Sequence, residues 1–338
     1  MRLLLPVLAL LAAGSGAFAA PPTERTADVG TNIDWSEREN GGPARYRIGA
    51  VTLTLDTAGD PAERDLRRTI LIVAMPGHAP LRVLGVSTTD EGVRVAVGRW
   101  GDGRPFVLFQ SFTGGTHCCS EVQLILPEGR RLRAIQVGTW DGGFLDLPTD
   151  VDGDGVLDFV VRDNRFLYAF ASYAGSHAPP QIWNILGGRS VDVSAAPRYR
   201  PLFAAAMNEE RADCLAGGAE ANSPCAAYVA AAARAGQFVR AWREMLPVYE
   251  RRPEFGMPPG CRVRAAFGAC PQRHWIEYPD FPSALRPFLI ATGYLPRGSD
   301  GVRAFRGGAR VHPAAAADRA GARGADGVGE RGMRAARK

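Results

Sequence analysis

The sequence predicts a mainly β antiparallel domain, folded as a sandwich, barrel or partial propeller, followed by a smaller α-helical, disulfide-bonded region. Short runs of β-branched and aromatic residues, broken by turn residues, fill the chain up to about residue 195. Alanine-rich sequence with helical spacing and four cysteines follows. Because 338 residues exceed one average domain, we expect more than one folded region.

The first residues have the features of an export signal. Arg2 precedes an apolar run from Leu3 to Ala13, and Ala17-Phe18-Ala19 is a small-residue pattern of the kind that signal peptidase cleaves. We therefore predict a signal peptide over residues 1–19 and a periplasmic or secreted mature protein. No later apolar run reaches about 18 residues, so no transmembrane segment is expected after signal removal.

Residues 22–195 are predicted to form the β-rich domain. Their candidate strands have hairpin spacing, which favours an antiparallel meander. The predicted strands span residues 46–55, 69–75, 81–87, 93–100, 106–112, 121–126, 132–139, 144–147, 157–162, 166–172 and 181–185.

Four carboxylates crowd the segment that follows the strand predicted at 144–147. Asp150, Asp152, Asp154 and Asp158 lie within nine positions, and Gly155 permits a sharp bend. Unpaired, these charges would repel one another strongly. Hard oxygen ligands favour Ca²⁺, so we predict a calcium site with these four side chains and the backbone carbonyl of Val156 as ligands.

The flanks of this segment exclude an EF-hand. The twelfth position, which requires a glutamate, is Val161, and the sequences FLDL and VLDFVVRD on either side predict strands rather than helices. An aspartate-rich turn that needs no metal is the alternative.

Residues 144–170 resemble the calcium hairpin of FG-GAP (integrin α-chain-like) and VCBS-type repeats, in which an Asp-x-Asp-x-Asp-Gly-x-x-Asp loop joins two strands. The resemblance implies an ion that braces a hairpin. The DGDG motif occurs once, which departs from the family's repeats.

The chain also looks like a group of uncharacterised bacterial exported proteins, on the combination of GGTHCCSEV, the DGDG loop and RDNRFLYAFASYAGS. This resemblance implies a periplasmic location and no activity.

Residues 199–296 are predicted to form the helical, cysteine-containing domain. One helix is expected from Cys225 to Leu246 and a second from Ser283 to Thr292. Cysteines of an exported protein are expected to be oxidised, and short spacings favour bridges Cys214–Cys225 and Cys261–Cys270.

The adjacent pair Cys118 and Cys119 follows His117 and leaves several interpretations open. These are a vicinal disulfide, bridges to distant cysteines, a copper or zinc site held by His117 and Cys119, and a Cys–His nucleophile.

No catalytic constellation is identified in the sequence. The five histidines stand apart, without metalloprotease, hydrolase or nucleotide-binding motifs. Asp141 and Asp146 are candidates for outer ligands of the calcium loop or for an acid pair formed with it.

The formal net charge of +5 arises largely in residues 297–338, a Gly- and Ala-rich tail predicted to be disordered. We interpret this basic tail as a solvated extension and expect no specific nucleic acid binding.

The favoured function is an exported calcium-stabilised protein of binding or structural type, with an unknown protein or glycan partner. One alternative is an exported hydrolase with a site near His117 and the acidic hairpin. Another is a redox or soft-metal protein that uses the Cys118–Cys119 pair.

Overall fold

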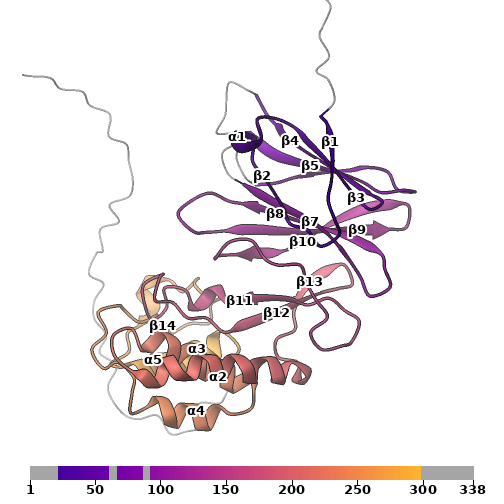
Figure 1. The fold of residues 1–338 in the computed structure, drawn as a ribbon. Coiled ribbons are helices and arrows are strands. Elements are labelled where there is room, and N and C mark those ends of the chain that lie inside the picture. Colours follow the sequence, from indigo (N-terminus) through magenta and orange to yellow (C-terminus); the bar gives the residue numbers. More distant parts are fainter. Residues whose placement is uncertain (1–21, 61–66, 87–91, 298–338) are drawn as a thin grey trace, which may run out of the picture. The chain divides into compact units, whose positions relative to one another are not determined.

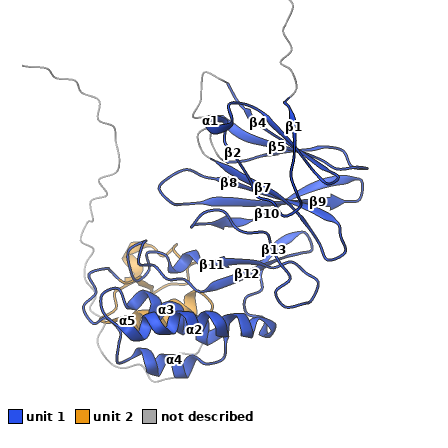
Figure 2. Ribbon diagram, viewed as in Figure 1, with its two compact units in different colours: residues 1–256 blue, residues 257–338 orange. Residues whose placement is uncertain are grey.

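A computed structural model describes residues 22–60, 67–86 and 92–297 of the chain (Figure 1). The chain divides into two compact units, residues 1–256 and 257–338 (Figure 2). The structure confirms a mainly antiparallel β fold followed by helices. The predicted signal peptide lies outside the described residues, as does the predicted basic tail apart from residue 297.

The first unit begins with a five-stranded sheet in the order β1-β3-β4-β5-β6. Its strands pair antiparallel, except that β1 runs parallel to β3. Buried and exposed residues alternate along β3, as expected for a sheet with one covered face. The strands are β1 (Glu24–Thr26), β3 (Ala44–Ile48), β4 (Val51–Ala58), β5 (Arg68–Ala74) and β6 (Leu81–Leu84).

A second five-stranded sheet is entirely antiparallel and has the order β10-β9-β8-β7-β2. Its strands are β2 (Ile33–Trp35), which the short helix α1 (Glu37–Asn40) follows, β7 (Val93–Arg99), β8 (Pro105–Phe112), β9 (Ser120–Glu128) and β10 (Arg131–Trp140).

The two sheets share one hydrophobic core, so the β region is a sandwich. Trp35, Leu53 and Phe109 are fully buried members of this core. Because side chains alternate across a strand, Val107 and Phe109 of β8 face this core while Phe106 and Leu108 belong to a second one. The central strand is therefore buried on both faces, which explains its continuous apolar run.

The second core joins the middle sheet to a three-stranded sheet of order β11-β12-β13. Phe159 and Val161 of the small sheet are buried in it, and the Trp140 and Trp183 rings meet edge to face at 6.0 Å. The strands are β11 (Phe159–Arg162), β12 (Pro180–Leu186) and β13 (Arg189–Asp192). The first unit thus has three β layers, visible in Figure 1.

Helices complete the first unit. Pro197 starts a short 3₁₀ turn that leads directly into α2, and α2 packs along α3. The elements are η2 (Asn164–Phe166), η3 (Pro197–Tyr199), α2 (Arg200–Ala216), α3 (Asn222–Arg234) and α4 (Phe238–Met245).

Two elements predicted as continuous are divided in the structure. The strand expected at 46–55 is a hairpin of β3 and β4, because Gly49 turns the chain with a φ of 56°. The helix expected from Cys225 to Leu246 is α3 and α4, separated at Gly236 with a φ of 79°. Both glycines adopt the left-handed conformation that side chains disfavour.

Two predicted strands are absent from the described residues. In the segment 144–147, the buried Gln110 side chain takes the place of a neighbouring strand: its Nε2 donates to the Leu145 carbonyl at 2.8 Å, and its Oε1 accepts from the Leu145 N–H at 2.6 Å. The segment 166–172 instead begins in η2 and continues as turns.

The second unit, in its described part, contains a two-stranded ladder, a short 3₁₀ helix and one α-helix. These elements are β14 (Gly260–Cys261), η4 (Gln272–His274), β15 (Trp275–Ile276) and α5 (Phe281–Ala291). The Asp280 carboxylate caps α5 by accepting from the Ser283 N–H at 2.9 Å, which explains why the helix begins there.

Among the described residues, no helix combines the length and apolar character needed to cross a bilayer.

One carboxylate of α4 connects this helix with α2 and α3. Glu244 accepts hydrogen bonds from Arg211 of α2 at 2.8 Å, from Tyr228 of α3 at 2.7 Å and from Arg240 at 3.0 Å. These donors, Arg211 foremost, lower the pKa of Glu244 from 4.5 to about 2. Burial, together with the bond to Glu244, raises the pKa of Tyr228 to about 12.

The Glu244 network predicts a pH-dependent stability. A lowered pKa stabilises the fold fully above the unfolded-state value, and that contribution is lost as pH falls from about 4.5 toward 2. Urea unfolding of wild type and Glu244→Gln should show a gap in unfolding free energy at neutral pH that narrows across this window. The exposed Glu254→Gln is the control. A gap that persists unchanged at pH 2 would contradict the assignment.

Candidate metal site in the aspartate loop

The aspartate loop, residues 150–158, is closed by a pair of backbone hydrogen bonds. The Thr149 N–H donates to the Asp158 carbonyl at 3.2 Å, and the Asp158 N–H donates to the Thr149 carbonyl at 2.7 Å. β11 starts immediately after the loop. The loop is therefore the tip of a hairpin at the entrance to the third sheet.

Asp150 organises the turn. Its Oδ1 accepts from the N–H groups of Gly153 at 2.8 Å and Asp154 at 3.1 Å, and its Oδ2 accepts from the Gly155 N–H at 2.9 Å. Gly153 and Gly155 have φ angles of 78° and 83°, which only glycine adopts without strain. The backbone thus wraps around one carboxylate.

Asp158 is the buried member of the group, at 1% exposure. Its Oδ2 accepts from the Val151 N–H at 2.8 Å, and its Oδ1 accepts from Asn184 Nδ2 at 2.6 Å and from the Tyr199 hydroxyl at 2.5 Å. Burial and the bond to Asp158 raise the pKa of Tyr199 to about 12. The hydroxyl therefore keeps its proton as a donor to Asp158 at neutral pH.

Asp152 and Asp154 face a cation supplied by the chain. Nε of Arg198 lies against Asp152 Oδ2, and its Nη2 lies 3.5 Å from Asp154 Oδ2. The Asp152 side chain is only 4% exposed, and its Oδ2 accepts no well-directed hydrogen bond. A hydrogen bond to Tyr199, together with these two carboxylates, raises the pKa of Arg198.

The structure brings three of the four predicted carboxylate ligands together. One carboxylate oxygen from each of Asp150, Asp152 and Asp158 lies within 4.8 Å of the other two. The Asp154 carboxylate lies outside this group, and its Oδ1 accepts from the Val156 N–H at 2.8 Å. Three converging carboxylate oxygens, one of them already paired with Arg198, are donors of the type that a hard cation binds.

The sequence did not predict the residues that contact the aspartate loop. Asn184, Arg198 and Tyr199 lie 26 or more residues beyond Asp158. The Arg198-Tyr199 dipeptide carries no pattern that would tie it to an acidic turn so far away.

All six cysteines lie in pairs at bonding distance. The sulfurs of Cys214 and Cys225 are 2.02 Å apart and those of Cys261 and Cys270 are 1.93 Å apart, the pairs that sequence spacing favoured. Cys118 and Cys119 are joined to each other, across a cis peptide bond.

The residues of the predicted hydrolase alternative are connected through a tyrosine. The His117 ring stacks on Tyr173 with centroids 3.8 Å apart, and the Tyr173 hydroxyl donates to Asp141 Oδ1 at 2.8 Å. This bond raises the pKa of Tyr173. Among the described residues, neither group of three potential metal ligands includes His117.

Fold and site together define the class: a β-sandwich protein with an acidic hairpin loop and a helical region braced by a disulfide. Residues 203–293 match the family model of the sll0997 C-terminal domain. This match runs from within α2 to the end of α5 and includes four cysteines, but it does not include the aspartate loop. The likeness of residues 144–170 to FG-GAP and VCBS hairpins therefore stays a prediction.

Two curated proteins resemble the chain over 196 residues, which are 56% of it. The "Probable thylakoid lumen protein sll0997" of Synechocystis sp. (strain PCC 6803) is 37% identical over 57% of its own length. "Uncharacterized protein y4bJ" of Sinorhizobium fredii (strain NGR234) is 35% identical over 30% of its length. The chain thus spans less than two thirds of either relative. No solved structure matches it significantly.

The buried contact between Tyr199 and Asp158 predicts a stability loss. Tyr199→Phe removes one donor from a buried carboxylate, which should lower the free energy of unfolding by about 1–3 kcal/mol. Urea unfolding in the presence of EDTA measures it. Tyr168→Phe, at a side chain that is 49% exposed, is the matched control. Equal stability of Tyr199→Phe and wild type would refute the role given to this contact.

Removal of the Cys214–Cys225 bridge should also lower the free energy of unfolding. Replacing both residues by alanine frees a loop in the unfolded chain and should cost about 2–4 kcal/mol in unfolding free energy. The same change at Cys118 and Cys119 should cost much less by this mechanism, because adjacent residues close no loop. Non-reducing peptide mapping checks the pairing, and a Cys214–Cys118 peptide would contradict it.

Proposed function

We propose that this chain is an exported, calcium-stabilised protein of binding or structural type. The observation that carries the proposal is the convergence of carboxylate oxygens from Asp150, Asp152 and Asp158 within 4.8 Å. Like charges this close destabilise a fold unless a cation or a proton neutralises them.

The donor chemistry favours calcium over softer metals, because the loop offers carboxylate and carbonyl oxygens without nitrogen or sulfur. Asp150, Asp152, Asp154 and Asp158 would hold the ion, with the Val156 carbonyl as a backbone ligand. When bound, the ion supplies charge neutralisation and a cross-link between the two arms of the hairpin.

Calcium would brace the junction between sheet and helices. Asp158 sits at the start of β11 and accepts the Tyr199 hydroxyl, and Tyr199 immediately precedes α2. Fixing Asp158 therefore fixes the point from which α2 departs. A framework of this kind suits a protein that presents a surface to a protein or glycan partner.

An exported location is supported by the relative named as a thylakoid lumen protein, since a lumen lies across a membrane from the cytoplasm. Cysteines paired at bonding distance agree with an oxidising compartment. We place the protein in the periplasm or the secreted fraction.

Calcium removal tests the proposal. Relative to protein in EDTA, free calcium at a hundredfold excess over its dissociation constant should raise the free energy of unfolding by about 2.7 kcal/mol. The double variant Asp152→Asn, Asp154→Asn should lose this response.

Asp102→Asn is the matched control, because Asp102 also lies in a Gly-Asp-Gly turn but pairs with Arg104 outside the aspartate loop. It should keep the full calcium response. Identical unfolding curves of the wild type in EDTA and in calcium would reject the site.

A further inference from the structure

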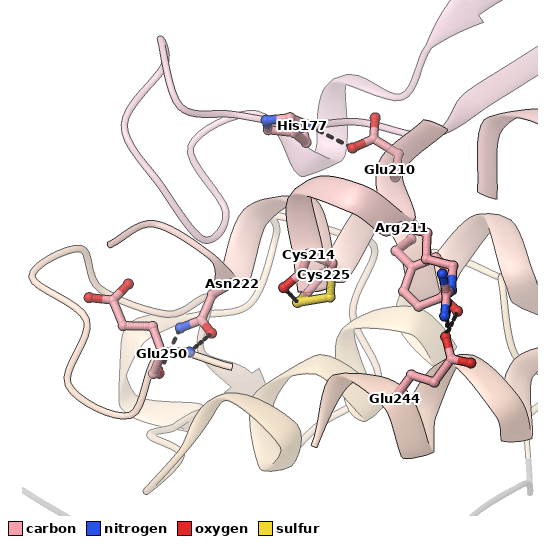
Figure 3. The surroundings of a disulfide bond; sticks show 9 residues. His177, Glu210, Arg211, Cys214, Asn222, Cys225, Glu244 and Glu250 are labelled. Carbon is pink, nitrogen blue, oxygen red and sulfur yellow. Dashed lines mark hydrogen bonds and ion pairs between the residues drawn. A yellow bond between two sulfur atoms is a disulfide. The ribbon is translucent and has the colours of Figure 1, made fainter. Parts of the chain in front are cut away.

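We propose that His177, Glu210 and Asp213 form a second metal site, suited to Zn²⁺. One potential ligand atom from each residue lies within 4.8 Å of the other two. His177 Nδ1 is 2.7 Å from Glu210 Oε2 (Figure 3). This cluster is separate from the aspartate loop and shares no residue with it.

The ligand types set the metal class. One imidazole nitrogen and two carboxylate oxygens are ligands that zinc binds at about 2.0–2.2 Å, and three protein ligands with an open position are common for this ion. Calcium prefers six to eight oxygens, so a cluster with a histidine and two acids serves it poorly. The two metal sites therefore select different ions.

The helix α2 positions the two acids. Glu210 and Asp213 are three residues apart, so they lie on one face of the helix, about one turn apart. Cys214, the residue after Asp213, is fully buried and is bridged to Cys225 of α3 (Figure 3). The bridge holds this turn of α2 against α3.

The same α3 positions the histidine. The His177 N–H donates to Ser223 Oγ at 2.8 Å, and Ser223 is a buried residue in the first turn of α3. The loop that carries His177 is thus fixed to one helix, while the acids are fixed to the same helix through the disulfide. All three residues are therefore held in place by α3, and a metal site needs such a rigid support.

Exposure leaves room for an ion to enter. The His177 and Glu210 side chains are 33% and 16% exposed, and Asp213 is exposed. Glu210 also lines a surface pocket of about 470 Å³ with Arg162 and Ala178. The buried side of the cluster is therefore partly desolvated, and the open side can admit water or a small ligand to the metal.

An ion pair between His177 and Glu210 is the competing explanation for their contact. Such a pair needs no third residue, whereas a metal site requires Asp213 as a ligand. Asp213 is therefore the residue that separates the two explanations.

The experiment uses the full, oxidised protein, stripped with EDTA, saturated with calcium and titrated with zinc by calorimetry. If the aspartate loop is a calcium site, calcium occupies it before zinc is added. If the loop binds no calcium, the effect of the His177 and Asp213 variants on zinc binding can still be measured. Wild type should bind zinc, and His177→Gln or Asp213→Asn should weaken binding by at least about tenfold, the lower end of what even an outer partner contributes to a metal site.

Glu209→Gln is the control, because it removes one negative charge from α2 next to Glu210, and Glu209 is not one of the three clustered ligands. It should leave zinc affinity nearly unchanged. Asp213→Asn alters an exposed side chain, so it keeps the test valid if His177→Gln fails to fold. Cobalt(II) added in place of zinc should give a visible absorption band that Asp213→Asn abolishes.

Absence of zinc binding by the wild type would overturn the proposal. Equal affinity of the wild type and Asp213→Asn would do so too, because the ion would then lie elsewhere or the contact would be a simple ion pair.

Discussion

The burial of the Asp158 carboxylate constrains how the aspartate loop, the third sheet and α2 meet. A buried charge is strongly unfavourable unless donors surround it. Here they come from three places: the loop backbone at Val151, the second strand of the small sheet at Asn184, and the turn before α2 at Tyr199. Each donor has to be in position for the carboxylate to stay buried. This requirement couples the hairpin, the sheet and the first long helix, although their residues are far apart in sequence.

The middle sheet explains how the aspartate loop comes to lie where it does. Its strands are covered on one side by the first sheet and on the other by β11 and β12, through two hydrophobic cores. The third sheet is small, and its apolar residues Phe159 and Val161 are buried because they pack on this second face. Hydrophobic burial thus places β11, and the polar network of Asp158 then fixes the loop at its start. Hydrophobic burial, which has no preferred direction, sets the layer in which β11 lies, and the directional hydrogen bonds of Asp158 set the geometry of the loop.

Local sequence patterns predicted much of the fold. Alternating and continuous apolar runs predicted most strands, and glycines with aspartates predicted the loop, because these signals depend on neighbouring residues. These local signals do not reveal contacts between distant residues. The Gln110 side chain bonds the backbone of Leu145 as a neighbouring strand would, so the apolar segment predicted as a strand is irregular in the structure. For the same reason the sequence did not connect Arg198 with Asp152, or His177 with Glu210. Those pairs exist only because the packed layers bring distant segments together.

Charge balance in the aspartate loop supports the proposed cation. Two full charges 4.8 Å apart repel by about 1 kcal/mol in water and by roughly 3–4 kcal/mol at an effective dielectric constant of about 20. Arg198 contacts Asp152 and Asp154, and its single positive charge cannot balance four carboxylates. Neutral donors stabilise Asp150 and Asp158 without cancelling their charge. Arg198 therefore lowers the repulsion in the metal-free loop, and since it occupies Asp152, a divalent ion that uses this carboxylate has to compete with the guanidinium. The residue that offsets part of the loop's negative charge thus also competes with a cation for Asp152.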